Sequence, residues 1–505
     1  MKQYFILIFF TIFSCVGSAQ KDAPCHLPLT LSSNAPVCEG NELHLSAQGG
    51  TSYQWTGPDG FFSSDQNPVV SSFTTLNAGY YYVTATDANG CTGTDSLLAQ
   101  LLTAPYSDFN ISSCPVMNNL VQFTASDTTA DNWQWTFDQN THTSSGMHVL
   151  HGFNEDGYHC ITLTTTNQCG TVTDNKTIYV YPNECVCGYT YTLEDTTITT
   201  SHVITINNYP NGIYIKGDIH IAPGVSISLE GITVYCAPDA RIIVEQGGKL
   251  FLQDNVTLTG LPSPCSYMWQ GIEVWGYDSL TSTSGLQGLI YGGYRSKIEL
   301  AHIGILQGMR NMDYVCDANT VPFIFSSSGG LAKVNEIIFD KDGYGAMIIH
   351  KTTREVVGSF AYCHFLCSGV LTDVRYSSLN SIHYPTRHNP WVNSNTNNIT
   401  NAGIWAEFTS FECNSNNFSN LKRGLELYDT RNYILSCNFY NCTYGIYIQN
   451  YLSAIDSRHE ISQCTFDKIP GTANTFGAAI YLRGGRYDFI HDNTFGVDHL
   501  NPQSN

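Results

Sequence analysis

The sequence predicts an all-β protein in which two small strand-rich domains precede a long solenoid of stacked strands. Short segments of alternating apolar and polar residues recur along the 505-residue chain, separated by turns rich in glycine, asparagine and aspartate. In the last third of the chain, phenylalanine and glycine return at a nearly constant interval. Such an interval is typical of a repeat architecture.

The composition suits an extracellular β-protein. Charged residues make up 13% of the chain, about half of the ~25% that is usual in soluble domains. The 42 acidic residues outnumber the 22 basic ones, and the formal net charge is −20. Binding to nucleic-acid phosphates needs a basic surface, so this balance argues against a nucleic-acid partner.

The first residues have the features of a secretory signal peptide, which we expect to span residues 1–19. Lys2 supplies the positive start, residues 4–13 are apolar, and small residues precede a cleavage point at Gln20. Lipoprotein processing at Cys15 is the alternative. The apolar segment is too short to span a bilayer, and no later segment is long enough. We therefore expect a secreted or cell-surface protein without a transmembrane segment.

Residues 27–103 carry short alternating strands over a length that suits a β-sandwich. The stretches "VCEG", "YQWTGPDGF" and "AGYYYVTATDANGC" resemble the Ig-like domains of secreted proteins of the Bacteroidetes type. The resemblance implies a disulfide between Cys38 and Cys91. It also implies that Trp55 belongs to the core and is not a ligand contact.

Residues 104–182 are similar to a PKD domain, another seven-stranded sandwich. The stretches "VQFTAS", "WQWTFD", "HGF" and "GYHCITLTTTN" follow in the order of that family, but its acidic turn is degraded to "TFDQN". The degraded turn argues against the calcium site of some relatives. We expect Cys114 to pair with Cys169, and Cys160, which alternates with apolar neighbours, to be a buried thiol.

The stretch "YPNECVCG" marks the junction to the solenoid. Cys185 and Cys187 are too closely spaced for a typical zinc knuckle, and no further His/Cys pair follows nearby. We expect a disulfide tie at this junction, because an exported protein forms disulfides.

Residues 189–505 read as a solenoid whose repeat is clearest after residue 335. A glycine that opens an alternating apolar stretch lies six positions after three of the repeat phenylalanines, at Gly345, Gly424 and Gly445. One coil cannot bury its own inner face, whereas coils stacked at ~4.8 Å can. If the one long interval counts as two coils, the mean repeat is 26 residues. The repeat phenylalanines are Phe339, Phe365, Phe418, Phe439, Phe466 and Phe495.

This region resembles the right-handed parallel β-helix of pectate-lyase-like proteins, and "MWQGIEVWG" is its most specific match. The resemblance implies a ladder of asparagine side chains, for which Asn420 and Asn441 lie in place. Cys363, Cys437 and Cys464 each lie two positions before a repeat phenylalanine, so we expect them to face inward as reduced thiols. The chain stops soon after Phe495 without a visible cap, so we expect it to be truncated at its C-terminus.

Two charge clusters and one insert are the candidate sites on the solenoid. The clusters could act as acids and bases, but they fall where solvated loops between coils are expected. The insert at 375–398 is rich in aromatic residues and could stack on a sugar ring, although an ordinary surface loop is the simpler interpretation. Trp269 and Trp275 could face a glycan or lie in the core. The weak catalytic candidates are Asp456, Arg458, His459, Arg486, Asp488 and His491, and the possible glycan contacts are His383, Tyr384, Arg387, His388 and Trp391.

The sequence thus favours a monomeric, non-catalytic extracellular or cell-surface protein. Its sandwiches would act as spacers, and its β-helix would bind a polysaccharide or a surface protein without a cofactor. The alternative is a polysaccharide lyase or glycoside hydrolase, which the fold resemblance alone suggests. A hydrolase needs paired carboxylates and a lyase needs a base, with Ca²⁺ held by carboxylates.

Overall fold

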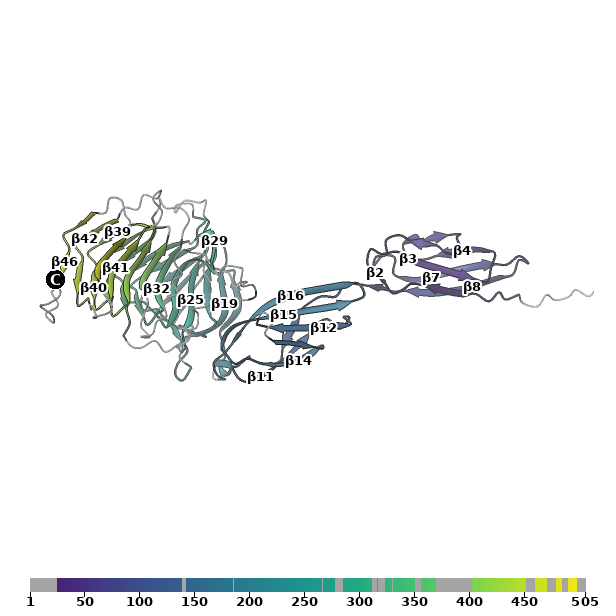
Figure 1. Cartoon of the computed structure of the whole chain (residues 1–505), viewed down its shortest axis with the longest axis horizontal. Helices are drawn as coiled ribbons and strands as arrows, with labels where there is room; N and C mark the ends of the chain where they lie inside the picture. Colours follow the sequence, from purple (N-terminus) through teal and green to yellow (C-terminus); the bar gives the residue numbers. More distant parts are fainter. Residues whose placement is uncertain are drawn as a thin grey trace, which may run out of the picture.

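The computed structural model contains two β-sandwiches and a parallel β-solenoid, which follow one another along the chain (Figure 1). It describes residues 25–138, 142–184, 186–265, 267–277, 285–310, 316, 323–328, 330–349, 356–368, 402–407, 409–450, 459–469, 478–483 and 489–496. Within these ranges the only helical turns are two 3₁₀ segments, η1 (Pro58–Gly60) and η2 (Val186–Gly188). None of the described residues forms a helix that could span a bilayer.

The first sandwich packs two antiparallel sheets around Trp55, as predicted, with Tyr81 beside it. A short parallel pair of strands closes the end that faces the next domain. The sheets are β1 (Thr30–Ser33), β3 (Leu43–Gln48) and β6 (Val69–Val70); and β5 (Phe62–Ser63), β4 (Ser52–Thr56), β7 (Gly79–Thr86) and β8 (Thr92–Ala99). The parallel pair is β2 (Val37–Cys38) and β9 (Leu101–Leu102).

The second sandwich is built around a cluster of aromatic rings that includes Trp135 and Phe137. Its longest hairpin, β15 and β16, runs the length of the domain (Figure 1). The two sheets are β10 (Phe109–Ile111), β11 (Leu120–Ala125) and β14 (His148–Gly152); and β13 (His142–Ser145), β12 (Asn132–Phe137), β15 (Gly157–Asn167) and β16 (Gly170–Val180).

Each solenoid coil contributes one strand to each of three parallel faces, which we call A, B and C, in the order B, C, A along the chain. Face A holds β22 (Arg241–Val244), β25 (Trp269–Val274), β28 (Ala301–Arg310), β32 (Tyr344–Ile349), β35 (Ala402–Glu407), β38 (Arg423–Tyr428), β41 (Tyr444–Gln449) and β44 (Ala478–Arg483). Face B holds β18 (His202–Thr205), β20 (Ser226–Glu230), β23 (Lys249–Leu252), β26 (Leu289–Gly292), β30 (Leu331–Asn335), β33 (Val356–Ala361), β36 (Ser410–Asn414), β39 (Arg431–Leu435), β42 (His459–Ser462) and β45 (Phe489–His491).

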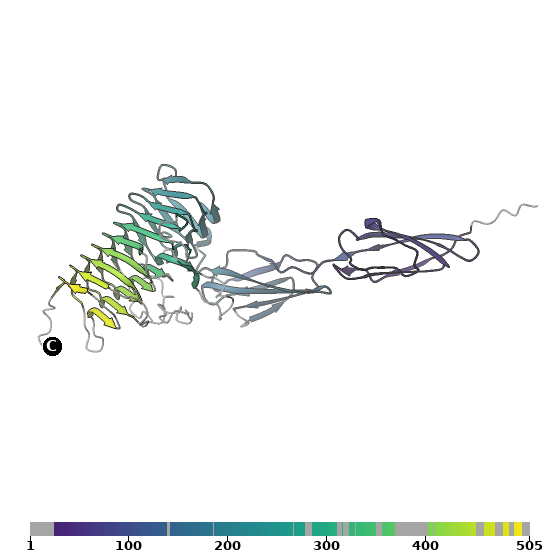
Figure 2. The same cartoon turned by 90° about the horizontal axis from the view of Figure 1, so that it is seen from above.

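Face C holds β21 (Thr233–Cys236), β24 (Thr257–Gly260), β27 (Lys297–Glu299), β31 (Ile338–Asp340), β34 (His364–Leu366), β37 (Asn417–Ser419), β40 (Asn438–Tyr440), β43 (Thr465–Asp467) and β46 (Thr494–Phe495). At the start of the solenoid, β17 (Leu193–Ile198) and β19 (Ile213–Ile221) bend across faces C and A, and β29 (Phe323–Ser328) pairs antiparallel with β28. Figure 2 shows the strands stacked in successive coils.

The six repeat phenylalanines form one continuous column on the inner side of face C. Neighbouring rings are nearly parallel, with centroids 4.6 to 5.2 Å apart. Phe365 stacks directly on Phe418, and β34 pairs with β37. The interpretation of the long interval as two coils is therefore wrong, because it is a single coil that carries an insert.

The glycines of the repeat make room for the ring of the following coil. A Cβ atom added at Gly424 would lie 2.5 Å from Cδ1 of Phe439, and one at Gly445 would lie 2.7 Å from Cδ1 of Phe466. These distances are far inside van der Waals contact. Glycine and phenylalanine therefore recur together, because each ring occupies the space that a side chain at the glycine of the preceding coil would fill.

The corners of the coils carry the predicted asparagine ladder. Asn441 donates from its amide to Oδ1 of Asn420 at 2.8 Å. Both residues have positive φ, +59° at Asn420 and +51° at Asn441, a conformation that asparagine tolerates better than most residues. This hydrogen bond uses one donor of the Asn441 amide and one acceptor of the Asn420 amide, and it links one coil to the next.

Cys363, Cys437 and Cys464 are free thiols that point into the solenoid and are fully buried, as predicted. Cys437 has its Sγ atom 3.6 Å from that of Cys413, another free thiol. Burial raises the pKa of Cys363 to about 12 and that of Cys437 well above its ordinary value.

The predicted disulfide pairs Cys38–Cys91 and Cys114–Cys169 are wrong, although all four residues do form disulfides. Cys91 pairs with Cys25, Cys38 with Cys169, and Cys114 with Cys187. Cys91 precedes β8, whereas Cys38 lies beside β9 at the far end of the first sandwich. Cys169 and Cys114 are likewise separated by the length of β16.

Cys160 is not the buried thiol that its neighbours suggested, because it pairs with Cys316 of the solenoid. At the junction before the solenoid, Cys187 forms a disulfide as expected, and Cys185 lies outside the described residues.

We predict that Gly424→Ala destabilises the solenoid, because the new methyl group would have to displace the ring of Phe439. Overpacking of this kind costs about 1–3 kcal/mol, measurable as a lower midpoint of urea denaturation. Gly293→Ala is the matched control, since its Cβ would lie 3.5 Å from the nearest atom, an ordinary contact. Equal midpoints for the two variants would contradict this role of glycine.

We further predict that the thiols of the solenoid interior resist a thiol reagent in the native protein and react in denaturant without any reductant. Their high pKa values keep them protonated, and burial excludes the reagent. A denatured protein with no reactive thiol would show that these cysteines are oxidised.

Candidate functional site

Most of the candidate side chains predicted from the sequence lie outside the part of the chain that the structure describes. The five insert residues, His383, Tyr384, Arg387, His388 and Trp391, lie outside the described residues, as do Asp456, Arg458, Arg486 and Asp488. Within the described ranges, no group of three His, Cys, Asp or Glu side chains is placed to hold a metal ion.

His459 lies in the interior of the solenoid and not on an outer loop. It follows Phe411 and Asn432 in the inward column of face B, and it is fully buried. His491, by contrast, is exposed and bonds to the neighbouring Asp492. The interpretation of these histidines as members of two equivalent outer clusters is therefore wrong for His459.

The two tryptophans of the stretch "MWQGIEVWG" each form a hydrogen bond within the protein. Trp269 is fully buried in the core cluster and donates from Nε1 to the carbonyl of Glu299. Trp275 is half-buried and donates from Nε1 to Oε2 of Glu273 at 3.2 Å. Trp269 is thus a core residue.

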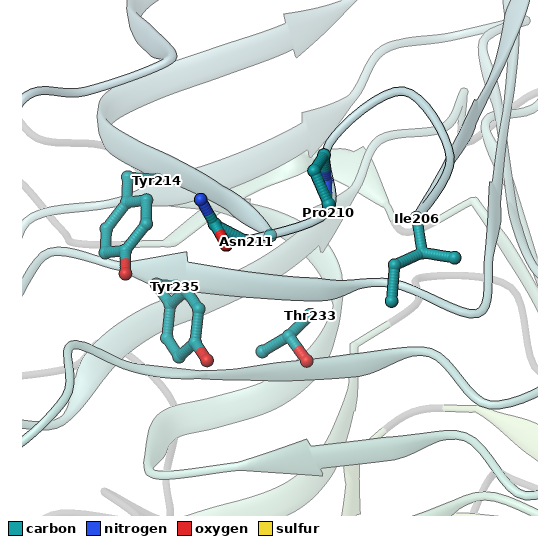
Figure 3. A pocket seen from close by; sticks show the side chains of 7 residues that line it. Ile206, Pro210, Asn211, Tyr214, Thr233 and Tyr235 are labelled. Carbon is teal, nitrogen blue, oxygen red and sulfur yellow. The ribbon is translucent and has the colours of Figure 1, made fainter.

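An open depression on the outer side of face C is a candidate site among the described residues (Figure 3). It has a volume of about 620 Å³ and lies between β21 and the turn that joins β18 to β19. Its lining contains no charged side chain. The lining residues are Ile206, Pro210, Asn211, Gly212, Tyr214, Thr233 and Tyr235.

The sequence "YPNG" places the turn against β21. Gly212 has φ of +80°, a conformation that favours glycine, and its N–H donates to the carbonyl of Tyr209 at 2.9 Å. A Cβ atom at Gly212 would lie 2.6 Å from the carbonyl oxygen of Thr233 and 3.0 Å from the ring of Tyr235. Glycine therefore lets the turn close over the strand and form one wall of the depression.

Three tyrosines form a column on the outside of face C. The rings of Tyr189 and Tyr214 have centroids 5.5 Å apart, and those of Tyr214 and Tyr235 are 4.8 Å apart and tilted by 26°. Burial and the two neighbouring tyrosines raise the pKa of Tyr214. Its hydroxyl therefore stays protonated at neutral pH and can both donate and accept a hydrogen bond.

The depression combines apolar, aromatic and neutral polar groups. Figure 3 shows the polar side chains of Tyr214, Tyr235, Thr233 and Asn211 and the apolar side chains of Ile206 and Pro210 around the depression. Such a lining can pack against the C–H face of a sugar ring while it exchanges hydrogen bonds with hydroxyl groups. The sequence carries one signal of this site, the return of tyrosine at about the length of a coil, which the phenylalanine spacing alone does not reveal.

A second group of polar and aromatic side chains lies on the outer side of face A. Arg423 and Tyr428 both bond to Oε1 of Glu426, and the guanidinium of Arg423 lies 4.6 Å from the ring centroid of Tyr447. Burial opposes the charge of Arg423, but the Glu426 carboxylate outweighs it and raises the pKa of Arg423. Glu426 is buried and doubly bonded, so this network is closed within the protein.

Family comparisons assign two parts of the chain. The PKD domain model matches residues 103–181, and the model of the right-handed beta helix region matches residues 402–497. The chain contains a PKD domain and a right-handed β-helix. Comparison with curated proteins finds no match to this sequence.

Among solved structures, the chain is similar to Ig-domain ectodomains and related complexes. The mouse nectin-like molecule 4 ectodomain (Ig1–Ig3) matches at 12% identity and a TM-score of 0.22, over 30% of this chain and 64% of that one. A chain of the mouse coronavirus receptor-binding domain complexed with its murine receptor matches at 12% identity and a TM-score of 0.22, over 31% and 100%. Murine CEACAM1b matches at 12% identity and a TM-score of 0.21, over 31% and 100%. The present chain thus spans less than two thirds of the nectin-like ectodomain.

We predict that His459 makes the β-helix less stable at acidic pH. Burial lowers the pKa of His459 to about 4, whereas the unfolded chain takes up this proton near pH 6.5. Between these values the unfolded state binds more protons. The free energy of unfolding should therefore fall by about 3 kcal/mol in all as the pH drops from about 6.5 to 4.

Urea denaturation of the wild type and of His459→Gln at pH 7 and pH 4.5 tests this expectation. The variant should show the smaller difference between the two pH values, and the exposed-site control His491→Gln should behave as the wild type. An unchanged pH dependence in His459→Gln would place the acid sensitivity elsewhere.

Proposed function

We propose that the protein is an exported, non-catalytic binding protein whose β-helix holds a neutral glycan in the depression at Tyr214 and Tyr235. In this proposal the two sandwiches are spacers that carry the β-helix away from the point of attachment. The observation that carries it is the uncharged lining of hydroxyl, amide and aromatic groups around one open depression.

The location is supported by the disulfides and by the first residues of the chain. Disulfides persist in oxidising compartments outside the cytosol, and four of them join described cysteines here. The signal-peptide features of residues 1–19 favour the same location.

Charge favours a neutral glycan over an acidic one. The protein has a formal net charge of −20, and the depression presents no lysine or arginine to a carboxylate or sulfate group. An acidic glycan would meet repulsion without a local partner. Neutral sugar rings offer C–H faces and hydroxyl groups, which match the lining in both respects.

The alternative, a polysaccharide lyase or glycoside hydrolase, has one observation in its favour. Glu407 and Glu426 come from neighbouring strands of face A, and hydrolases use two carboxylates at close range. Glu407 is fully buried and Glu426 nearly so. Glu426 is moreover engaged by Arg423 and Tyr428, so the pair does not offer two free carboxylates.

A glycan array with the purified protein, followed by titration calorimetry on the best ligand, tests the proposal. We expect binding to one or more neutral polysaccharides and no release of reducing ends or unsaturated products from any glycan. Binding to acidic glycans only, or to no glycan, would overturn the proposed ligand. Product release would establish the enzymatic alternative.

We predict that Tyr235→Ala weakens glycan binding at least tenfold, which corresponds to about 1.4 kcal/mol, because it removes a ring and a hydroxyl from the depression. Asn211→Ala should weaken binding less, since it removes the amide alone. Tyr291→Ala is the matched control, because Tyr291 is 46% exposed on face B, away from the depression. Equal losses for Tyr235→Ala and Tyr291→Ala would contradict the site.

A further inference from the structure

We propose a mechanical function: the disulfides Cys38–Cys169 and Cys160–Cys316 form a covalent tension path that joins the first sandwich to the β-helix through the single strand β15. When a force pulls on the chain just ahead of Cys25 and on the β-helix, this path would carry the load and leave both sandwiches folded. The inference does not depend on which ligand the β-helix binds.

The first disulfide joins the two sandwiches at their shared end. Cys38 ends β2, beside β9, which is the last strand of the first sandwich. Cys169 lies in the tight turn between β15 and β16, and the disulfide encloses a sequence separation of 131 residues. The amide of Asn167 also donates to the carbonyl of Thr103 at 3.0 Å. The junction is therefore crossed by the backbone, a disulfide and a hydrogen bond.

The second disulfide joins the PKD domain to the β-helix at the opposite end of the same strand. Cys160 lies near the start of β15 and pairs with Cys316, across a sequence separation of 156 residues. A hydrogen bond also joins the PKD domain to the β-helix, since Tyr181, which follows β16, donates from its hydroxyl to Oδ2 of Asp239 at 2.7 Å. Burial raises the pKa of Asp239 to about 6, and Tyr181 partly offsets this effect.

The strand between the two disulfides spans the PKD domain from end to end. β15 pairs with β16 along its whole length and with β12 over its second half. Figure 1 shows β15 running between the first sandwich and the β-helix. Because a β-strand is already nearly extended at ~3.3 Å per residue, this segment can lengthen very little under load.

The covalent path therefore removes most of the chain from the line of force. Without the disulfides, tension would enter each sandwich at its terminal strands and could extend roughly 75 residues, or about 250 Å, per domain. With them, only the short segment from Cys25 to Cys38 and the strand β15 lie between the tip and Cys316. The disulfide Cys114–Cys187 is not part of this path, because it joins the PKD domain to the entry of the β-helix.

Single-molecule force spectroscopy tests the proposal on the full chain. One handle is fused ahead of Cys25, and the other is attached by click chemistry in place of Lys333, an exposed residue of β30. The oxidised wild type should show no extension step of sandwich length. The same molecules, reduced after they have folded, should show steps of about 250 Å at the same forces.

A matched pair of variants isolates the first disulfide. The control Cys25→Ser/Cys91→Ser loses a disulfide at the tip but keeps the tension path, and it should behave as the oxidised wild type. Adding Cys38→Ser and Cys169→Ser should produce a new step of about 250 Å from the first sandwich. A step of this length in the oxidised wild type, or its absence from the reduced wild type, would overturn the proposal.

Discussion

The stacking of one coil on the next at about 4.8 Å is the constraint on which the solenoid depends. A single coil has three short strands and cannot bury its own inner side chains, so every interior residue must meet its counterpart in the neighbouring coil. The column of phenylalanine rings satisfies this condition on face C, and the glycines of face A make room for those rings. The asparagine ladder satisfies it at the corners, where side-chain amides bond from coil to coil.

Because the interior is filled by these columns, ligand chemistry is confined to the outer faces. The tyrosine column at Tyr214 and Tyr235 follows the same coil spacing as the phenylalanines, but on the outside of face C. Stacked rings give a rigid surface there, which loses little conformational entropy when a ligand binds. On face A the corresponding outward groups around Glu426 are buried and bonded to one another, so they stabilise the fold and are not open to a ligand.

The repeating parts of the fold could be predicted from the sequence, because each depends on residues at fixed spacing. Phe439, Gly445 and Asn441 identify a coil, and the inward thiol of Cys437 follows from its place in that coil. The pairing of Cys38 could not be predicted in this way, since its partner belongs to another domain and the pairing depends on how the domains meet. The position of His459 was predicted wrongly because alternate side chains of a β-strand point inward even where the surrounding sequence is rich in charged residues.

The candidate site escaped the sequence analysis for a related reason. Tyr214 and Tyr235 are neighbours only through the pairing of β19 with β21, and the wall of the depression depends on the positive φ of Gly212. The sequence shows the tyrosines and the "NG" turn separately. Their combination into one depression is a property of the coil register.

The coil between Phe365 and Phe418 is much longer than the coil between Phe418 and Phe439, yet both keep the register of the solenoid. Asn416 lies 53 residues after Cys363 and bonds to it, whereas Asn441 lies 21 residues after Asn420 and bonds to it, yet ring stacking is the same in both coils. By loop-closure entropy, the longer connection costs less than about 1 kcal/mol extra. A coil can therefore accept added segments at little energetic cost, so evolution or design can lengthen a coil with recognition loops without disturbing the register of the solenoid.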